Sequence, residues 1–269
     1  MKLCVNTNTY HGFSLEEALN GIAKTGFKYV ELTAVAGWTE HVLSGMSAGE
    51  IDKVKTMVSE KGLSILGLSG HCNIMDDDGL KAFLENIRLA RKLGCAYIIT
   101  STGEAHGGKD VEDDEVLINN LKKIGKACEE AGIVCAVETH GGVYNTGERM
   151  NQLVQRVGSE YVGVNYDTAN VIFYGKVKPE KEIANSFPGL KYVHLKDKDG
   201  KQDEWNFPAV GKGYVDFITI VKVLEANAYD GPLSIEIEFT PEGPGPLENV
   251  NKAVADSYNY LKKIKESFV

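Results

Sequence analysis

The sequence alternates short apolar, β-rich runs with longer amphipathic segments, and this alternation recurs about eight times along its 269 residues. Strands separated by helices at this spacing predict a parallel sheet with the helices packed outside it. Eight such units with no linker-like stretch between them favour one closed (β/α)₈ TIM barrel over residues 1–269. The expected strands cover residues 3–7, 28–32, 63–69, 96–100, 133–138, 162–167, 191–196 and 232–238.

Helix start and stop signals lie where this arrangement requires them. Ser47 and Glu50 have the spacing of a capping box, and Gly62 follows the helix that they open. An amphipathic segment expected from Leu80 ends at Gly94 in the same way. A doubly wound nucleotide-binding sheet would show a GxGxxG motif after its first strand, but HGFSLEE follows Tyr10 with a single glycine.

Charged and imidazole side chains end four successive apolar runs in the second half of the chain: Glu138, Asp167, His194 and Glu236. The carboxyl ends of barrel strands meet on one face, so these side chains can converge. Three carboxylates held close together repel one another unless a cation compensates their charge. The four residues therefore predict a divalent metal site of oxygen and imidazole ligands, which suits Mn²⁺, Mg²⁺, Co²⁺ or Zn²⁺.

Composition narrows the class of partner. The net charge is −9 and no stretch clusters Lys and Arg with aromatic residues, which argues against nucleic acid and anionic membranes. The five cysteines form no CxxC pair, as expected of reduced thiols in a cytoplasmic protein. The first residues lack the apolar region of a signal peptide, and no apolar run approaches the ~20 residues of a membrane span.

The second half of the chain also carries a family resemblance. VETHGG (137–142), NYDTANV (165–171), VHLKD (193–197), GKGYVDF (211–217) and YDGPLSIEIE (229–238) resemble the sugar phosphate isomerase/epimerase family of xylose isomerase-like TIM barrels. The resemblance covers nearly the whole chain. It implies that Glu138, Asp167, His194 and Glu236 bind one divalent metal ion, with Mn²⁺ the first choice.

The resemblance further implies a sugar epimerase or isomerase that removes the proton beside the carbonyl of a ketose or keto-sugar, through a metal-bound enediolate. One of Glu138 and Glu236 would act as the base and the other as the acid. Loss of a β-hydroxyl from the same intermediate would instead make a dehydratase or lyase acting on a keto-inositol or 3-keto-sugar. A sugar-binding barrel without catalysis is disfavoured by the presence of both glutamates. Relatives imply a homo-oligomer, a dimer or a tetramer.

Several positions depart from the family pattern. Asn170 stands where many relatives have a substrate-binding histidine, and the segment after His194 lacks the arginine of several ketose epimerases. Endonuclease IV-type DNA repair is a minor alternative, because histidines near His71 and His106 bind extra zinc ions in that type. In a sugar-processing enzyme the same positions suit substrate contacts, and we expect these contacts to be His71, His106, Asn170 and Lys196.

Other residues near the strand ends admit two interpretations each. Glu238 competes with Glu236 as the ligand of the last strand, because alternation points both the same way. Lys196 could also be an exposed loop lysine, and His140 is a weaker candidate than the other histidines. Trp38 and Trp205 suit either a sugar face or a subunit contact. The amides of 211–213 could bind a phosphate, which leaves phosphorylated and free sugars both open. 

Overall fold

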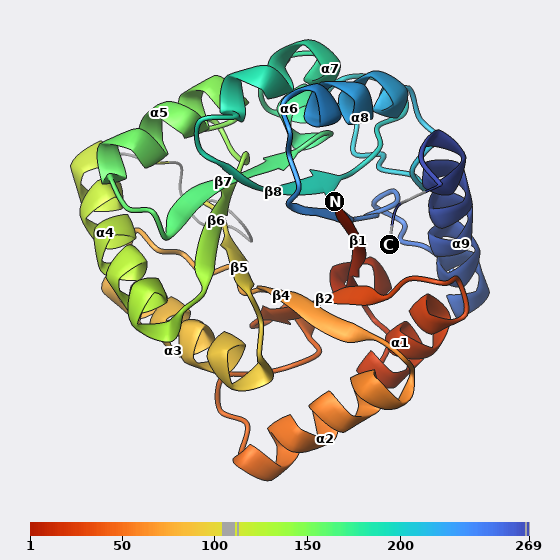
Figure 1. Ribbon diagram of the computed structural model, residues 1–269, viewed down its shortest axis with the longest axis horizontal. Helices are drawn as coiled ribbons and strands as arrows, with labels where there is room; N and C mark the ends of the chain where they lie inside the picture. Colours follow the sequence, from red (N-terminus) through yellow and green to blue (C-terminus); the bar gives the residue numbers. More distant parts are fainter. Residues whose placement is uncertain (104–110, 112, 267, 269) are drawn as a thin grey trace.

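Eight parallel strands close into a barrel in the computed structural model, which describes residues 1–103, 111, 113–266 and 268 (Figure 1). The sheet runs in the order β1-β9-β8-β7-β6-β5-β4-β2, and β1 also pairs with β2, which closes the ring. The predicted barrel is therefore confirmed. The barrel strands are β1 (Lys2–Asn6), β2 (Tyr29–Val35), β4 (Ser64–Ser69), β5 (Tyr97–Thr100), β6 (Val134–Glu138), β7 (Val162–Asp167), β8 (Leu190–Leu195) and β9 (Pro232–Ile235).

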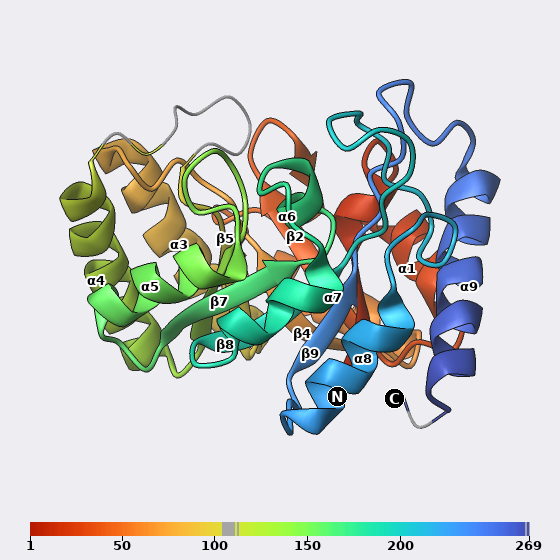
Figure 2. The ribbon, with the colours of Figure 1, turned by 90° about the horizontal axis from the view of Figure 1, so that it is seen from above.

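Helices surround the barrel, and the long loops that follow the strands rise on one side of it, opposite the N-terminus (Figure 2). The two-residue strand β3 (Thr39–Glu40) pairs antiparallel with the end of β2 on that side. The helices are α1 (Leu15–Ala23), α2 (Ala48–Glu60), α3 (Asp77–Leu93), α4 (Asp114–Ala131), α5 (Gly147–Val157), α6 (Asn170–Phe173), α7 (Pro179–Glu182), α8 (Phe217–Ala226) and α9 (Leu247–Ile264), with 3₁₀ turns η1 (Thr7–Tyr10) and η2 (Ile183–Ser186).

Local capping explains both the agreement and the differences at the element ends. The capping box of Ser47 and Glu50 is present at the start of α2, as predicted. Helix α3 begins at Asp77, earlier than Leu80, because the Asp76 side chain accepts the amide of Gly79 and caps it.

The last strand is shorter than the predicted 232–238, because β9 ends at Ile235. Beyond it, the amide of Ile237 donates to the Thr9 hydroxyl instead of to a neighbouring strand. Phe239 then pairs with Phe207 in an isolated antiparallel bridge, which ties the loop after β8 to the loop after β9.

Two apolar clusters divide the core. The larger one lies between the barrel and its helices, and a small one is formed by Cys4, Leu66, Ile99, Ala136 and Tyr192. Because strand side chains alternate, Ala136 and Tyr192 share the barrel interior with Glu138 and His194, two residues further along. The small cluster therefore forms an apolar floor beneath the polar strand ends.

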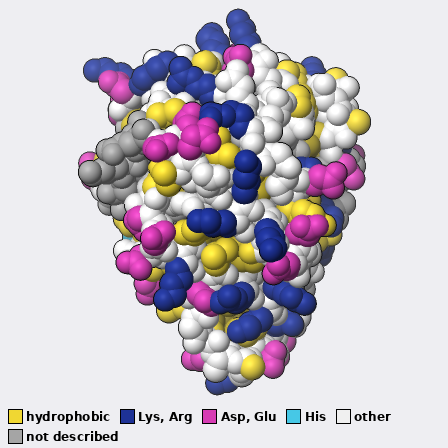
Figure 3. Space-filling model, turned by 90° about the vertical axis from the view of Figure 1, so that its left-hand side faces the viewer, with side chains coloured by type: hydrophobic (Ala, Val, Ile, Leu, Met, Phe, Trp, Pro, Cys, Tyr) yellow, Lys and Arg dark blue, Asp and Glu magenta, His cyan; other side chains and the backbone are white. Residues whose placement is uncertain are grey.

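Surface charge, the state of the cysteines and the polarity of the helices can be compared with the features expected from the composition. Basic and acidic side chains interleave on the face that lies on the left of Figure 1 (Figure 3). All five cysteines are free thiols, and four of them are buried. Over the described residues, the helices are too short or too polar to cross a bilayer.

Candidate metal centre and active site

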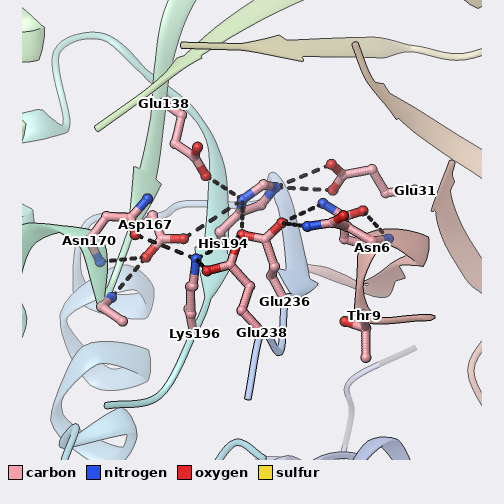
Figure 4. A network of polar contacts seen from close by, with 12 residues as sticks. Asn6, Thr9, Glu31, Glu138, Asp167, Asn170, His194, Lys196, Glu236 and Glu238 are labelled. Carbon is pink, nitrogen blue, oxygen red and sulfur yellow. Dashed lines mark hydrogen bonds and ion pairs between the residues drawn. The ribbon is translucent and has the colours of Figure 1, made fainter. Parts of the chain in front are cut away.

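Four strand ends bring Glu138, Asp167, His194 and Glu236 together at the centre of the barrel mouth (Figure 4). Glu138 and Asp167 are the last residues of β6 and β7, His194 lies near the end of β8, and Glu236 directly follows β9. One candidate ligand atom from each residue lies within 4.8 Å of the others, and all four residues are buried. The convergence expected from the sequence is therefore present, and this group could hold a metal ion.

The imidazole of His194 lies at the middle of the group. Its Nδ1 atom is 2.7 Å from Glu138 Oε1, 3.6 Å from Glu236 Oε2 and 3.9 Å from Asp167 Oδ2. Burial alone would lower the pKa of His194, but the carboxylates around it, Glu31 first, raise that pKa above its usual value. The imidazole thus sits where the surrounding negative charge concentrates.

The donor set fits a divalent cation. Asp167 Oδ1 accepts the amides of Ala169 and Asn170, whereas its Oδ2 is buried without a hydrogen-bond partner among the residues that the structure describes. Burial raises the pKa of Asp167 to about 7, and it also raises the pKa of Glu138. Buried carboxylates of this kind require compensating charge, and oxygen-rich ligands with one imidazole suit a divalent ion.

Glu31 is a fourth buried carboxylate beside His194, and the sequence interpretation missed it. It lies on β2, and both of its oxygens are 3.2 Å from His194 Nε2, on the side of the ring away from Nδ1. The Tyr192 hydroxyl donates to Glu31 Oε2 at 2.9 Å and holds the carboxylate in place. The only signal in the sequence is a single acid within the apolar run KYVEL. A carboxylate in this position fixes the ring so that Nδ1 faces the group.

We expect Glu31→Gln to weaken metal binding by about 10–100-fold, because a neutral amide orients the His194 ring less firmly than a carboxylate. Titration of Mn²⁺ against a competing chelator measures the affinity without any turnover. Glu182→Gln is the matched control, since Glu182 is also a buried acceptor, for the Tyr166 hydroxyl and two amides at the start of α5. Equal metal affinity in the Glu31→Gln and Glu182→Gln proteins would show that Glu31 only supports the fold.

Lys196 is buried, so its alternative interpretation as an exposed loop lysine is wrong. Its Nζ lies 2.6 Å from Glu238 and 3.4 Å from Glu236, and it donates to Asn170 Oδ1 at 3.5 Å. Burial alone would raise the pKa of Glu236, but Lys196 and His194 outweigh it and hold that pKa below its usual range. Glu238 thus pairs with the lysine, while Glu236 joins the four-residue group.

The three candidate histidines differ in how they lie relative to this group. His71 Nε2 is 4.0 Å from Glu138 Oε2 at the edge of the group. His140 Nε2 instead forms a hydrogen bond of 3.2 Å with the Tyr174 hydroxyl. His106 lies outside the described residues.

A cavity of about 330 Å³ opens above the four-residue group. Its volume lies within the range of small-ligand pockets. We call it the polar chamber, and its lining residues are Asn8, Val35, Trp38, Ser69, His71, Glu138, His140, Asn170, Tyr174, Lys196, Trp205, Glu236 and Glu238.

The glycine-rich turn at 211–213 does not offer its amides to a phosphate. The amides of Gly211 and Gly213 both donate to Asp197 Oδ2 at 2.8 Å, and Val215 donates to Oδ1 at 3.1 Å. A Cβ at Gly213 would lie 2.4 Å from that carboxylate, so the turn requires glycine there. The phosphate interpretation of these amides is therefore wrong, and Asp197 instead fixes the long segment after β8.

The fold and the site together define a class, a closed parallel barrel with a buried group of carboxylates and one imidazole at its strand ends that could hold a metal ion. The chain matches the xylose isomerase-like TIM barrel family over residues 19–264 and belongs to it. It is 29% identical to an inosose dehydratase of Clostridium perfringens over 205 residues, which cover 64% of this chain and 68% of that protein. An inosose dehydratase of Geobacillus thermodenitrificans is 25% identical over 159 residues, with 53% of each chain covered.

Solved structures agree on the architecture. A D-psicose 3-epimerase structure determined in the presence of D-fructose superposes with a TM-score of 0.79 at 17% identity, covering 98% of this chain and 99% of the other. A D-tagatose 3-epimerase-like protein gives a TM-score of 0.75 at 20% identity, with 99% of each chain covered. At these identities the likeness concerns the fold alone.

Proposed function

We propose that this protein is a divalent-metal-dependent sugar epimerase or isomerase that removes the proton from the carbon beside the carbonyl of a ketose or keto-sugar. The observation that carries the proposal is the position of Glu138 and Glu236. Both glutamates belong to the buried four-residue group, and both line the polar chamber where a substrate would lie. A base and an acid that face one substrate are what proton abstraction and return require.

Each residue has a defined task in this reaction. Glu138, Asp167, His194 and Glu236 would hold the metal, which when bound supplies positive charge beside the substrate carbonyl and acidifies the neighbouring C–H bond. One of the two glutamates takes the proton and leaves an enediolate of the sugar. The other delivers a proton to the opposite face, which inverts the carbon, or to the neighbouring carbon, which moves the carbonyl.

Other residues of the chamber orient the substrate and balance its charge. His71, Asn170 and Lys196 line the chamber and can form hydrogen bonds with sugar hydroxyls. The ammonium of Lys196 lies 3.4 Å from Glu236 Oε2. It can therefore balance the charge of this carboxylate as the glutamate gains or loses the proton. His106 stays a proposed substrate contact on the sequence alone.

A dehydratase acting on a keto-inositol or a 3-keto-sugar is the second candidate. The named relatives among the curated proteins favour it, because those from Clostridium and Geobacillus are inosose dehydratases. The first step is the same, and the β-hydroxyl then leaves instead of a proton returning.

Incubation in D₂O with ketoses, ketose phosphates, keto-inositols and 3-keto-sugars, followed by proton NMR, tests the proposal. Deuterium beside the carbonyl in a recovered sugar or its epimer identifies an epimerase or isomerase. Loss of a hydroxyl, seen as a new conjugated carbonyl absorbance, identifies the dehydratase. A metal-loaded protein that exchanges no proton with any of these substrates contradicts both reactions.

The remaining features of the proposal come from the sequence and the relatives. We expect Mn²⁺ as the metal, one catalytic domain over residues 1–269, and a homo-oligomer that acts in the cytoplasm on a small molecule without binding nucleic acid.

A further inference from the structure

A second, larger cavity adjoins the polar chamber. It measures about 580 Å³, and we call it the annex. Asn8, Trp38, Trp205 and Glu238 line both cavities, so the two adjoin along these four residues. The annex is lined by Asn8, Thr9, His11, Trp38, Trp205, Ile237, Glu238, Phe239, Thr240, Pro241, Gly243 and Pro244.

The lining of the annex is mainly apolar and includes both tryptophans of the sequence. Trp38 is 46% exposed and Trp205 is 36% exposed, which is unusual for residues of this size. Both rings are nonetheless held in place. Trp38 stacks on His11 with 4.1 Å between ring centroids, and Trp205 packs edge-on against Phe207 at 5.0 Å. Fixed, exposed aromatic faces are surfaces on which a ligand can stack.

One side chain connects the aromatic wall to the candidate metal group. The indole N–H of Trp38 donates to Asn8 Oδ1 at 3.1 Å, and Asn8 Nδ2 donates to Glu236 Oε1 at 3.5 Å. Glu238, on the same wall, is paired with Lys196 at 2.6 Å. A molecule held at the four-residue group therefore lies beside the annex, with Asn8 and Glu238 at the boundary that the two cavities share.

The chemistry of the annex limits its occupant. Among the described residues that line it there is no Lys or Arg, and its one carboxylate is neutralised by Lys196. A phosphate would find no cation there, and a free sugar would leave its hydroxyls against Ile237, Phe239 and two prolines. A flat apolar group would gain both burial and stacking.

We propose that the annex binds an aromatic aglycone, so that the substrate is a keto-sugar glycoside whose sugar ring occupies the polar chamber. This inference rests on the proposed function, since it places the reacting keto-sugar at the four-residue group. It extends that function by naming the substrate class as an unphosphorylated aryl glycoside of a keto-sugar.

Intrinsic fluorescence can test the inference directly, because the sequence contains two tryptophans and both line the annex. The metal-loaded protein is titrated with phenyl 3-keto-glucoside, methyl 3-keto-glucoside and free 3-keto-glucose. We expect the phenyl compound to bind about tenfold more tightly than the methyl compound, from burial and stacking of its ring. We also expect it to change the tryptophan emission more than the other two compounds do, because both indoles line the annex as well as the polar chamber. Isothermal titration calorimetry gives the affinities of all three compounds.

Two substitutions locate the effect. Trp205→Ala should reduce the phenyl preference to less than about threefold, whereas Trp205→Phe should retain most of it, because an aromatic face remains. The affinity of each variant for the methyl compound reports whether the sugar site is still folded. Trp38→Ala tests the other tryptophan of the annex in the same way and should also reduce the phenyl preference.

Equal affinity for the phenyl and methyl compounds, or a preference that survives both alanine substitutions, would overturn the inference. An emission change that follows protein dilution instead of ligand would show that a second copy of the chain fills the annex, which also overturns it. Binding needs no turnover, so an intact phenyl preference without deuterium exchange would support the annex and contradict the proposed reaction alone.

Discussion

Glu138→Gln and Glu236→Gln should each reduce deuterium incorporation beside the substrate carbonyl by at least about 100-fold, because in the proposed reaction each removes a group that takes or gives the transferred proton. Both carboxylates line the polar chamber and belong to the buried four-residue group. Glutamine keeps the size of the side chain but cannot accept a proton at neutral pH. Initial rates of exchange in D₂O, followed by proton NMR with saturating metal, measure the effect.

Glu60→Gln is the control for these variants. Glu60 is exposed at the C-terminal end of α2, which leads into the start of β4 at the end of the barrel opposite its mouth. Metal content should be measured for each protein before the rates are compared. If both active-site variants retained metal and exchanged as fast as the Glu60→Gln protein, the acid and base roles would have to be assigned elsewhere.

Addition of Mn²⁺ should raise the melting temperature of the metal-free protein strongly. At a concentration about a hundredfold above Kd, binding contributes about 2.7 kcal/mol, which corresponds to a rise of roughly 5–10 °C. The physical reason is that the cation compensates carboxylates that are buried in the folded protein only. Differential scanning fluorimetry with and without chelator measures the shift.

The Asp167→Asn variant distinguishes stabilisation by the bound metal from stabilisation by the hydrogen bonds of residue 167. The asparagine oxygen can still accept the amides of Ala169 and Asn170, so the loop after β7 keeps its caps. The variant loses the buried Oδ2 charge that faces His194, and its metal-dependent rise in melting temperature should largely disappear. A rise as large as that of the unsubstituted protein would mean that the ion binds away from this group.

The barrel and the convergence of its four strand ends could be predicted from the sequence because both depend on local periodicity. Each run of alternating or apolar residues ends in a visible polar residue, and parallel strands bring those ends to one face. Glu31 could not be identified in this way. Its role depends on the partner across the barrel, His194, which no local pattern around residue 31 reveals.

The glycine-rich turn shows a different limit of sequence interpretation. Free amides at 211–213 suggested an anion, and an anion is indeed bound there, but it is the side chain of Asp197. The acceptor, Asp197, lies 14 residues from Gly211 and 16 from Gly213 in the sequence, so the glycine motif alone does not reveal it. The burial of Lys196 could not be predicted for the same reason, because it depends on the ion pair with Glu238, which follows a different strand.

Closure of the ring has a consequence for how this protein assembles its candidate metal-binding group. Asn6 at the end of β1 donates to Glu236 Oε1 at 2.9 Å, across a separation of 230 residues. Strand β1 and strand β9, which Glu236 directly follows, are neighbours in the barrel although they are its first and last strands in the sequence. Contacts of such long range carry a large loop-closure cost and slow folding. A fragment that stops before β9 would therefore lack Glu236 and present only part of the candidate metal-binding group.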